Sequence, residues 1–166
     1  MTGNEQRAAQ LGAALLARGE WLVTAESCTG GGVAETLTAI AGSSGWFDRG
    51  FVTYSNTAKV EMLGVSELTL ARHGAVSEAT VRAMAQGAIA HSPAHWALAI
   101  TGIAGPGGGT PEKPVGMVWF AWAAREGGCL ASVRQLAGDR AAIREQAIAI
   151  ALQGMLDCLA QNDVAV

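Results

Sequence analysis

The chain has 166 residues, half of them apolar and 15% charged, which fits one domain (1–166) with a full hydrophobic core. A net charge of −3 and a pI near 5.6 provide no basic field, so we expect no extended nucleic-acid binding, although a small anionic ligand is compatible with this charge. Three widely spaced cysteines, no signal-peptide pattern and no apolar run of about 18 to 20 residues predict a cytoplasmic protein without a membrane span.

The first half of the chain alternates helix-like and strand-like patterns. Leu11 and Leu15 recur at helical spacing, and Gly19 stands where a C-terminal helix cap would, so we expect an opening helix. The next expected elements are a strand over 21–25, a helix over 31–41, a strand over 51–54 and short helices near 57–63 and 66–73.

The second half continues the alternation. Ser77 is placed to cap a helix that ends near Pro93. Strands are expected over 96–101, 117–124 and 130–136, the last two joined as a hairpin, and a helix over about 140–159 closes the chain. This order predicts an α/β fold, a three-layer α/β/α sandwich whose sheet is mixed and mostly parallel.

Three polar loops each leave a predicted strand, at 25–32, 54–59 and 101–109. In open α/β sheets, ligands bind in the crevice beyond the carboxyl ends of the strands. We therefore expect the three loops to form one shared site.

Ser27 and Lys59 are the first candidates for chemistry. Ser27 ends a strand and precedes glycines at a helix start, so it is either a nucleophile or a capping hydroxyl. Lys59 is one of two lysines against nine arginines, and a desolvated lysine can serve as a general base, whereas the alternative is a solvated surface lysine. Tyr54 could relay a proton or orient that amine.

Further along the chain, the glycine-rich run 101–109 could form an oxyanion hole, a phosphate nest or a mobile surface loop. Arg140 and Arg144 lie four residues apart at the start of the last helix, where cations are disfavoured. Either Asp139 and Glu145 or a ligand phosphate or carboxylate should compensate them.

Other chemistries fit the sequence poorly. His91 and His95 have the spacing of a metal pair, but Pro93 between them interrupts the helix that would align them, so we expect no metal. His73 has no obvious aspartate to orient it for a catalytic triad. Cys28 is an alternative nucleophile without an evident histidine to activate it.

Four ordered motifs resemble those of the C-terminal domain of the competence/damage-inducible CinA family, and the resemblance covers nearly the whole chain. The motifs are TAESCTGG at 24–31, YSNTAK at 54–59, GAVS at 74–77 and TGIAGPGG at 101–108. The resemblance implies a compact α/β/α domain, often oligomeric and working without a metal or other cofactor. Stand-alone members are nicotinamide-nucleotide amidases, so the implied reaction converts nicotinamide mononucleotide to nicotinate mononucleotide and ammonia.

Carried over by position, the resemblance makes Ser27 the nucleophile, Lys59 its general base and Tyr54 an assisting hydroxyl. It implies that the loop beginning at Thr101 holds the reacting carboxamide or its oxyanion and that Arg140 contacts the substrate. The full set of expected substrate-binding residues is Thr29, Gly30, Gly31, Asn56, Thr101, Gly102, Ala104, Gly105 and Arg140.

Two hypotheses from other classes stay open. The pocket could belong to a non-catalytic module that binds or senses a pyridine nucleotide. Alternatively, the chain could act by self-association, because the last helix carries apolar stripes at Ile143, Ala147 and Ile150 and at Leu152, Leu156 and Leu159. We expect a homodimer or higher homo-oligomer, although burial between layers would also explain these stripes.

Overall fold

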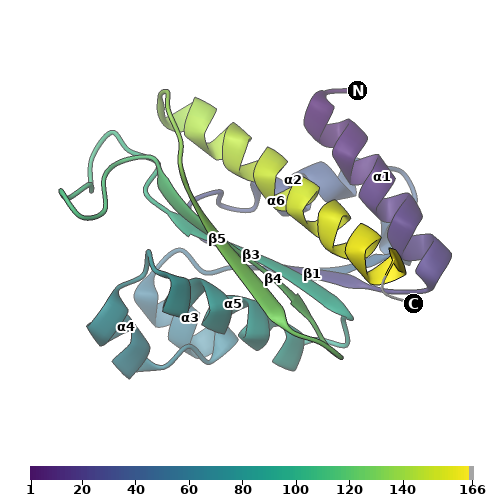
Figure 1. The fold of residues 1–166 in the computed structure, drawn as a ribbon, viewed down its shortest axis with the longest axis horizontal. Helices are drawn as coiled ribbons and strands as arrows, with labels where there is room; N and C mark the ends of the chain where they lie inside the picture. Colours follow the sequence, from purple (N-terminus) through teal and green to yellow (C-terminus); the bar gives the residue numbers. More distant parts are fainter. Residues whose placement is uncertain (165–166) are drawn as a thin grey trace.

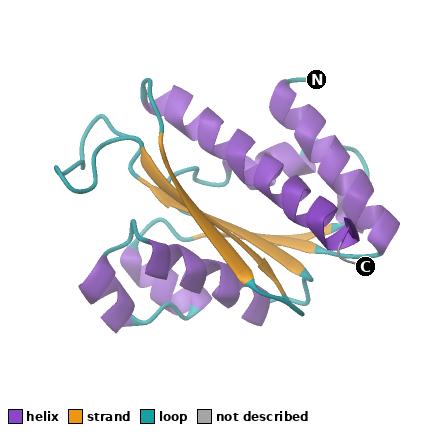
Figure 2. Cartoon of the chain, in the orientation of Figure 1, coloured by secondary structure: helices purple, strands orange, loops and turns teal. Residues whose placement is uncertain are grey.

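The computed structural model describes residues 1–164 and is built on a five-stranded sheet with helices on both faces (Figures 1 and 2). The strands lie in the order β2-β1-β3-β4-β5, with bounds β1 Leu22–Glu26, β2 Phe47–Val52, β3 Trp96–Gly102, β4 Met117–Ala124 and β5 Cys129–Gln135. β1 pairs parallel with β2 and β3, whereas β4 pairs antiparallel with β3 and β5, so β4 alone runs against the other four strands. The predicted three-layer sandwich with a mixed, mostly parallel sheet is confirmed.

Two groups of helices form the outer layers (Figure 1). Helices α1, α2 and α6 cover one face of the sheet, and α3, α4 and α5 cover the other. Their bounds are α1 Gly3–Arg18, α2 Gly32–Thr38, α3 Asn56–Leu63, α4 Glu67–His73, α5 Glu78–Ala90 and α6 Arg140–Val164, and a 3-10 turn, η1, spans Ser43–Gly45. No helix among the described residues is both long and apolar enough to cross a membrane.

The predicted elements are present, with errors at their ends. Gly19 adopts the left-handed conformation expected of a C-cap, with φ of 65°, and the Ser77 hydroxyl accepts a hydrogen bond from the Thr80 N–H. The prediction for β2 was wrong at its start, because this strand begins at Phe47 rather than 51. β2 is an edge strand and half exposed, so the polar pair Asp48 and Arg49 fits within it without an apolar pattern. Helix α2 ends three residues earlier than predicted and α6 five residues later.

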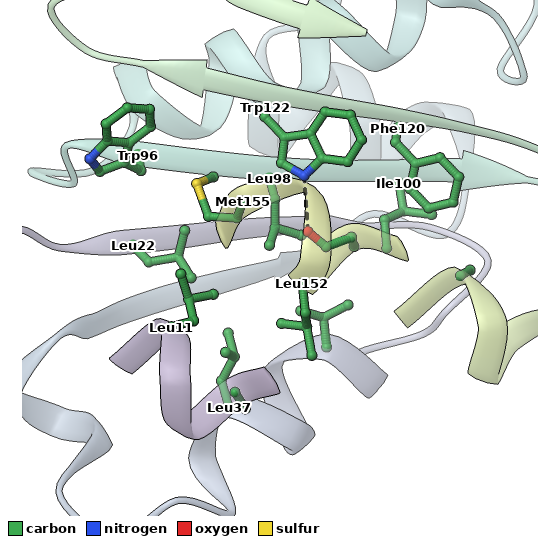
Figure 3. Close-up of a cluster of buried hydrophobic side chains, with 14 of the residues drawn as sticks. Leu11, Leu22, Leu37, Trp96, Leu98, Ile100, Phe120, Trp122, Leu152 and Met155 are labelled. Carbon is green, nitrogen blue, oxygen red and sulfur yellow. Dashed lines mark hydrogen bonds between the residues drawn. The ribbon is translucent and has the colours of Figure 1, made fainter. Parts of the chain in front are cut away.

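The two faces of the sheet carry side chains of different sizes. Large residues such as Leu98, Phe120 and Trp122 face α1, α2 and α6 (Figure 3), whereas alanines of β3 and β4 lie beneath α5. Small residues let backbones approach closely. At Gly87 of α5, an added Cβ would lie 2.0 Å from the Leu63 carbonyl oxygen of α3, so this approach requires glycine.

Helix α6 is fixed against the sheet by one hydrogen bond and by a row of buried apolar side chains. The Trp122 indole Nε1–H donates to the Ala151 carbonyl oxygen at 2.9 Å (Figure 3). The stripe residues Ile143, Ala147, Leu152 and Leu159 are buried against the same core. Ile150 and Leu156 are only partly buried, so burial between layers accounts for most of the two stripes. The homo-oligomer stays a prediction.

Candidate active site

Ser27 and Lys59 come together beyond the carboxyl ends of the parallel strands. Ser27 directly follows β1, and Lys59 lies in the second turn of α3, the helix that follows β2. The Ser55 hydroxyl caps this helix by accepting the Ala58 N–H at 3.0 Å, which fixes where Lys59 leaves the backbone. The Lys59 Nζ lies 3.2 Å from the Ser27 Oγ, within hydrogen-bonding distance.

Lys59 is a buried amine rather than a surface lysine. It is 1% exposed, and its Nζ donates to the Thr53 carbonyl oxygen at 2.8 Å. Among residues 1–164 it forms no ion pair with a carboxylate. Burial therefore lowers the pKa of Lys59 below its ordinary value of 10.5, which favours the neutral amine that a general base requires.

The turn that carries Ser27 is held by backbone hydrogen bonds. The Ser27 N–H donates to the Ile100 carbonyl of β3 at 3.0 Å, and the Gly30 N–H donates back to the Ser27 carbonyl at 2.9 Å. Gly30 and Gly31 have φ values of 58° and 100°, a region that disfavours other residues. These glycines let the chain reverse sharply from β1 into α2.

Glu26 anchors the same turn from inside the protein. It is fully buried, and its carboxylate accepts hydrogen bonds from the Thr29 hydroxyl at 2.6 Å, the Val33 N–H at 2.9 Å and the Ala34 N–H at 3.0 Å. The negative charge thus satisfies the amino end of α2. No role was predicted for Glu26 from the sequence, although an acidic residue between a strand and a helix start is a signal for such a cap.

A cavity of about 250 Å³ opens over the Ser27 and Lys59 side chains. Of the nine residues predicted to bind substrate, six line this cavity: Asn56, Thr101, Gly102, Ala104, Gly105 and Arg140. Thr29, Gly30 and Gly31 do not line it, since they form the turn behind Ser27. A larger hollow of about 560 Å³ lies at the other end of the sheet, near His95 and Trp96, but the contact between Ser27 and Lys59 makes the smaller cavity the candidate site.

The far wall of the cavity comes from the loops before α5 and after β3. The Thr101 hydroxyl, near the end of β3, donates to the Ala75 carbonyl oxygen at 2.8 Å, so it fixes the loop before α5 against this strand end. Ala75 and Val76 line the cavity, although the expected binding set did not include them. Their position within the GAVS motif was the available signal.

Arg140 and Tyr54 form the rim of the cavity. The Arg140 guanidinium donates to the Gly105 carbonyl oxygen at 2.7 Å and to the Tyr54 hydroxyl at 2.8 Å. Tyr54 is 61% exposed, and its hydroxyl is held by this arginine. The suggested pairing of Arg140 and Arg144 with Asp139 and Glu145 is not found among the described residues, because the Asp139 carboxylate instead accepts the Ala142 N–H at 2.9 Å and caps α6.

The alternative nucleophile and the histidines lie in unsuitable surroundings. Burial raises the pKa of the Cys28 thiol to about 11, so it is protonated at neutral pH and a poor nucleophile. The His95 Nδ1 accepts the Trp21 N–H at 2.9 Å, at the opposite end of the sheet from Ser27. Within residues 1–164, no three His, Cys, Asp or Glu side chains cluster as metal ligands would.

Comparisons with known proteins identify the family of this chain. The CinA C-terminal domain model matches residues 4–159. A curated relative from Escherichia coli (strain K12), named nicotinamide-nucleotide amidohydrolase PncC, is 56% identical over 164 residues, covering 98% of this chain and 99% of the relative. One of the same name from Pseudomonas putida is 52% identical over 136 residues, covering 81% and 84%.

Solved structures show the same similarity. The crystal structure of the competence/damage inducible protein CihA from Agrobacterium tumefaciens superposes with a TM-score of 0.92 at 48% identity and covers 96% of both chains. A CinA superfamily protein from Klebsiella pneumoniae also superposes with a TM-score of 0.92, at 41% identity, covering 96% of this chain and 99% of that one. The chain therefore belongs to the CinA C-terminal domain family.

Proposed function

We propose that this protein is a nicotinamide-nucleotide amidohydrolase that converts nicotinamide mononucleotide to nicotinate mononucleotide and ammonia. The observation that carries the proposal is the 3.2 Å contact between the Ser27 Oγ and the buried amine of Lys59 at the floor of the cavity. Relatives at 52% and 56% identity named for this activity support the substrate class.

The first half of the proposed reaction acylates Ser27. Neutral Lys59 takes the hydroxyl proton as the Ser27 oxygen forms a bond to the carboxamide carbon. The Thr53 carbonyl holds the amine by accepting one of its hydrogens, which leaves the nitrogen lone pair for the serine proton. The Lys59 ammonium then gives its proton to the departing nitrogen, so the C–N bond breaks and ammonia leaves.

The second half hydrolyses the ester. Lys59, neutral again, takes a proton from a water molecule that attacks the same carbon. The Ser27 oxygen leaves and regains its proton from Lys59, and nicotinate mononucleotide is released. Each half uses one proton shuttle, so a single titratable group serves the whole cycle.

Backbone N–H groups of the glycine-rich loop are suited to stabilise the oxyanion. Ala104 and Gly105 are both buried and line the cavity. Within residues 1–164, their N–H groups donate to no protein acceptor. A buried N–H group without an acceptor favours a negatively charged partner, such as the oxygen that develops charge during attack.

The size of the cavity indicates that the pyridine carboxamide and the ribose phosphate of the substrate bind in two adjoining hollows. Its volume of about 250 Å³ suits a pyridine carboxamide better than a whole nucleotide. A second hollow of about 480 Å³ adjoins it, since both are lined by Ala104 and Arg140. We place the ribose phosphate there, where the Arg140 guanidinium can pair with the phosphate.

Ammonia release from nicotinamide mononucleotide tests the mechanism. We expect Ser27→Ala and Lys59→Ala each to lower kcat by about a thousandfold or more, because each removes a group that acts on the reacting bond. Lys113→Ala is the matched control, since it removes the only other lysine, whose Nζ contacts the His73 carbonyl of α4. Its turnover should equal that of the unmodified protein.

Two results would contradict the proposal. Turnover close to normal in the Ser27 or Lys59 variant would refute the nucleophile and base. Binding of the mononucleotide without any nicotinate product at high protein concentration would favour the non-catalytic module instead. The cytoplasmic location and the single domain over 1–166 likewise stay predictions.

A further inference from the structure

One stripe of helix α6 contacts three segments of the candidate site. Arg140, Arg144 and Ile148 lie four residues apart on α6 and therefore share one face. Arg140 contacts the Gly105 loop, Arg144 contacts the turn after Ser27, and the Ile148 side chain packs over Gly32 at the start of α2, where an added Cβ would lie 2.8 Å from its Cδ1. The register of α6 is thus tied to the positions of all three segments.

Arg144 makes the contact nearest to the nucleophile. Its Nε donates to the Cys28 carbonyl oxygen at 3.2 Å and its Nη2 to the Thr29 carbonyl oxygen at 3.1 Å. Two donors on one rigid, planar group restrain two consecutive peptide units more than a single donor would. Glu26 holds the Thr29 hydroxyl as well, so Thr29 is held by an anion through its side chain and by a cation through its carbonyl.

We propose that Arg144 is a positioning residue for Ser27: its guanidinium holds the 28–29 backbone so that the Ser27 Oγ stays within reach of the Lys59 Nζ. The inference rests on the proposed function, because it assumes that Ser27 is the nucleophile. Arg144 is not among the residues that line the cavity, so its effect reaches the substrate only through this backbone.

Arg144 can affect Ser27 because the backbone path between the Cys28 carbonyl and the Ser27 side chain is short. The Cys28 carbonyl belongs to the 28–29 peptide unit, which is separated from the Ser27 Cα only by the planar 27–28 peptide unit, so a displacement of the 28–29 backbone reaches Ser27 over a short path. Gly30 and Gly31 follow at once, and glycines restrain a backbone less than other residues do. Without Arg144, the turn depends on the Ser27 N–H bond to Ile100, on the Gly30 and Gly32 N–H bonds within the turn, and on the Glu26 contacts, and the Cys28 carbonyl loses its guanidinium donor.

A serine-directed fluorophosphonate probe tests the proposal without the nucleotide. In this reaction the Ser27 oxygen forms a bond to phosphorus, the P–F bond breaks, fluoride leaves and Lys59 takes the hydroxyl proton. We expect Arg144→Met to slow labelling at Ser27 by about 10- to 100-fold, the loss typical of a misplaced reacting group. In turnover of the mononucleotide, kcat should fall by a similar factor while KM stays within about twofold.

Arg125→Met is the matched control. Arg125 also donates to backbone carbonyls through its guanidinium, but at the opposite end of the sheet. We expect both variants to lose thermal stability and only the Arg144 variant to lose labelling rate and kcat. Added guanidinium should restore part of the rate in Arg144→Ala and none in Ser27→Ala.

Four outcomes would contradict either the proposed nucleophile or the proposed role of Arg144. If the unmodified protein is not labelled at Ser27, the proposed nucleophile is wrong, whatever Arg144 does. If the protein is labelled and Arg144→Met reacts as fast, the positioning role is overturned. A raised KM with normal kcat would also overturn it, because Arg144 would then bind substrate. Should the Met variant misfold, Arg144→Lys keeps the charge with a single nitrogen, and full labelling by that variant would likewise refute the role of the paired donors.

Discussion

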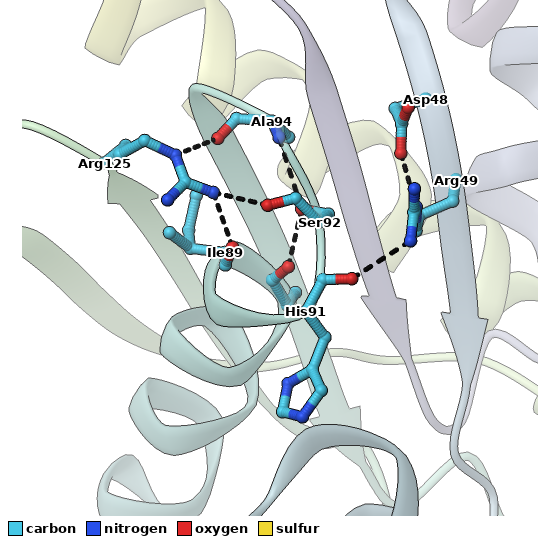
Figure 4. A network of polar contacts seen from close by, with 8 residues as sticks. Asp48, Arg49, Ile89, His91, Ser92, Ala94 and Arg125 are labelled. Carbon is cyan, nitrogen blue, oxygen red and sulfur yellow. Dashed lines mark hydrogen bonds and ion pairs between the residues drawn. The ribbon is translucent and has the colours of Figure 1, made fainter.

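At both ends of the sheet, arginine guanidinium groups donate hydrogen bonds to backbone carbonyl oxygens, but the segments that they stabilise differ. Away from the site, the Arg125 guanidinium donates to the carbonyl oxygens of Ala94, Ile89 and Ser92 at 2.8, 2.6 and 2.6 Å (Figure 4). The Arg49 guanidinium donates to the His91 carbonyl at 3.1 Å. These cations satisfy the carbonyl groups where α5 ends, the place where a helix favours positive charge.

At the site end, the arginines instead contact segments of the candidate site. Arg140 and Arg144 donate to carbonyls of the glycine-rich loop and of the Ser27 turn. The contact alone therefore does not identify a functional site. The distinguishing feature is Lys59, an amine buried beside a hydroxyl without a carboxylate partner among the described residues. Burial of such a group costs stability, and perturbed buried groups of this kind are typical of functional sites.

The largest expected effect is the pH dependence of activity, which tests whether the buried amine of Lys59 distinguishes the site end of the sheet. Burial lowers the pKa of Lys59, and only the neutral amine can accept the Ser27 proton. As the pH falls below the folded-state pKa of Lys59, kcat/KM should therefore fall by about tenfold per pH unit. Steady-state rates of ammonia release across the pH range measure this acid limb.

The limb should have an apparent pKa below 10.5, the ordinary lysine value. Lys113→Ala should show the same limb, since Lys113 lies outside the cavity lining. The Arg144 variants should keep it too, at lower rates. An acid limb that is absent from the unmodified protein would mean that no group with a lowered pKa acts as the base.

The sequence predicted the layers and the pairing of Ser27 with Lys59 better than the roles of their neighbours. Alternating apolar patterns and glycine breaks locate strands and helices, and the ends of parallel strands meet at one edge, so three loops could be placed together. The start of β2 was missed because Asp48 and Arg49 lie in an exposed edge strand, where no apolar alternation is needed.

Contacts that depend on tertiary distance could not be predicted. Arg144 lies 116 residues beyond Cys28, and only the packing of α6 brings its guanidinium to that carbonyl. One of the two predicted alternatives, ion pairs with Asp139 and Glu145, was local in sequence, whereas the observed partners are distant backbone oxygens. Spacing along a helix shows that Arg140 and Arg144 share a face, but not what that face contacts.

Arg125→Met should change stability and leave catalysis intact. The variant loses three hydrogen bonds from a charged donor at an exposed position, so we expect the free energy of unfolding to fall by about 1–2 kcal/mol. Urea unfolding measures this loss, and ammonia release should proceed with an unchanged kcat. If kcat fell as much in Arg125→Met as in Arg144→Met, the arginine contacts at the two ends of the sheet would not differ in their effect on catalysis.

Lys59→Met should give the smallest change in stability although it removes the proposed base. Methionine avoids the cost of burying an amine, but the Thr53 carbonyl loses its donor, so the free energy of unfolding at neutral pH should change by about 1 kcal/mol or less.

The unmodified protein and the Lys59→Met variant should differ in how their stability depends on pH. Because burial lowers the pKa of Lys59, the unfolded chain binds more protons than the folded one between the folded-state pKa and 10.5.

The stability of the unmodified protein should therefore rise with pH across that interval, relative to the Met variant. Urea unfolding of both proteins at several pH values measures the difference between them, in which contributions from all other titratable groups largely cancel. A difference that does not change with pH would show that Lys59 keeps an ordinary pKa in the folded state. The amine would then be charged at neutral pH, and its burial next to Ser27 would have to serve a purpose other than proton transfer.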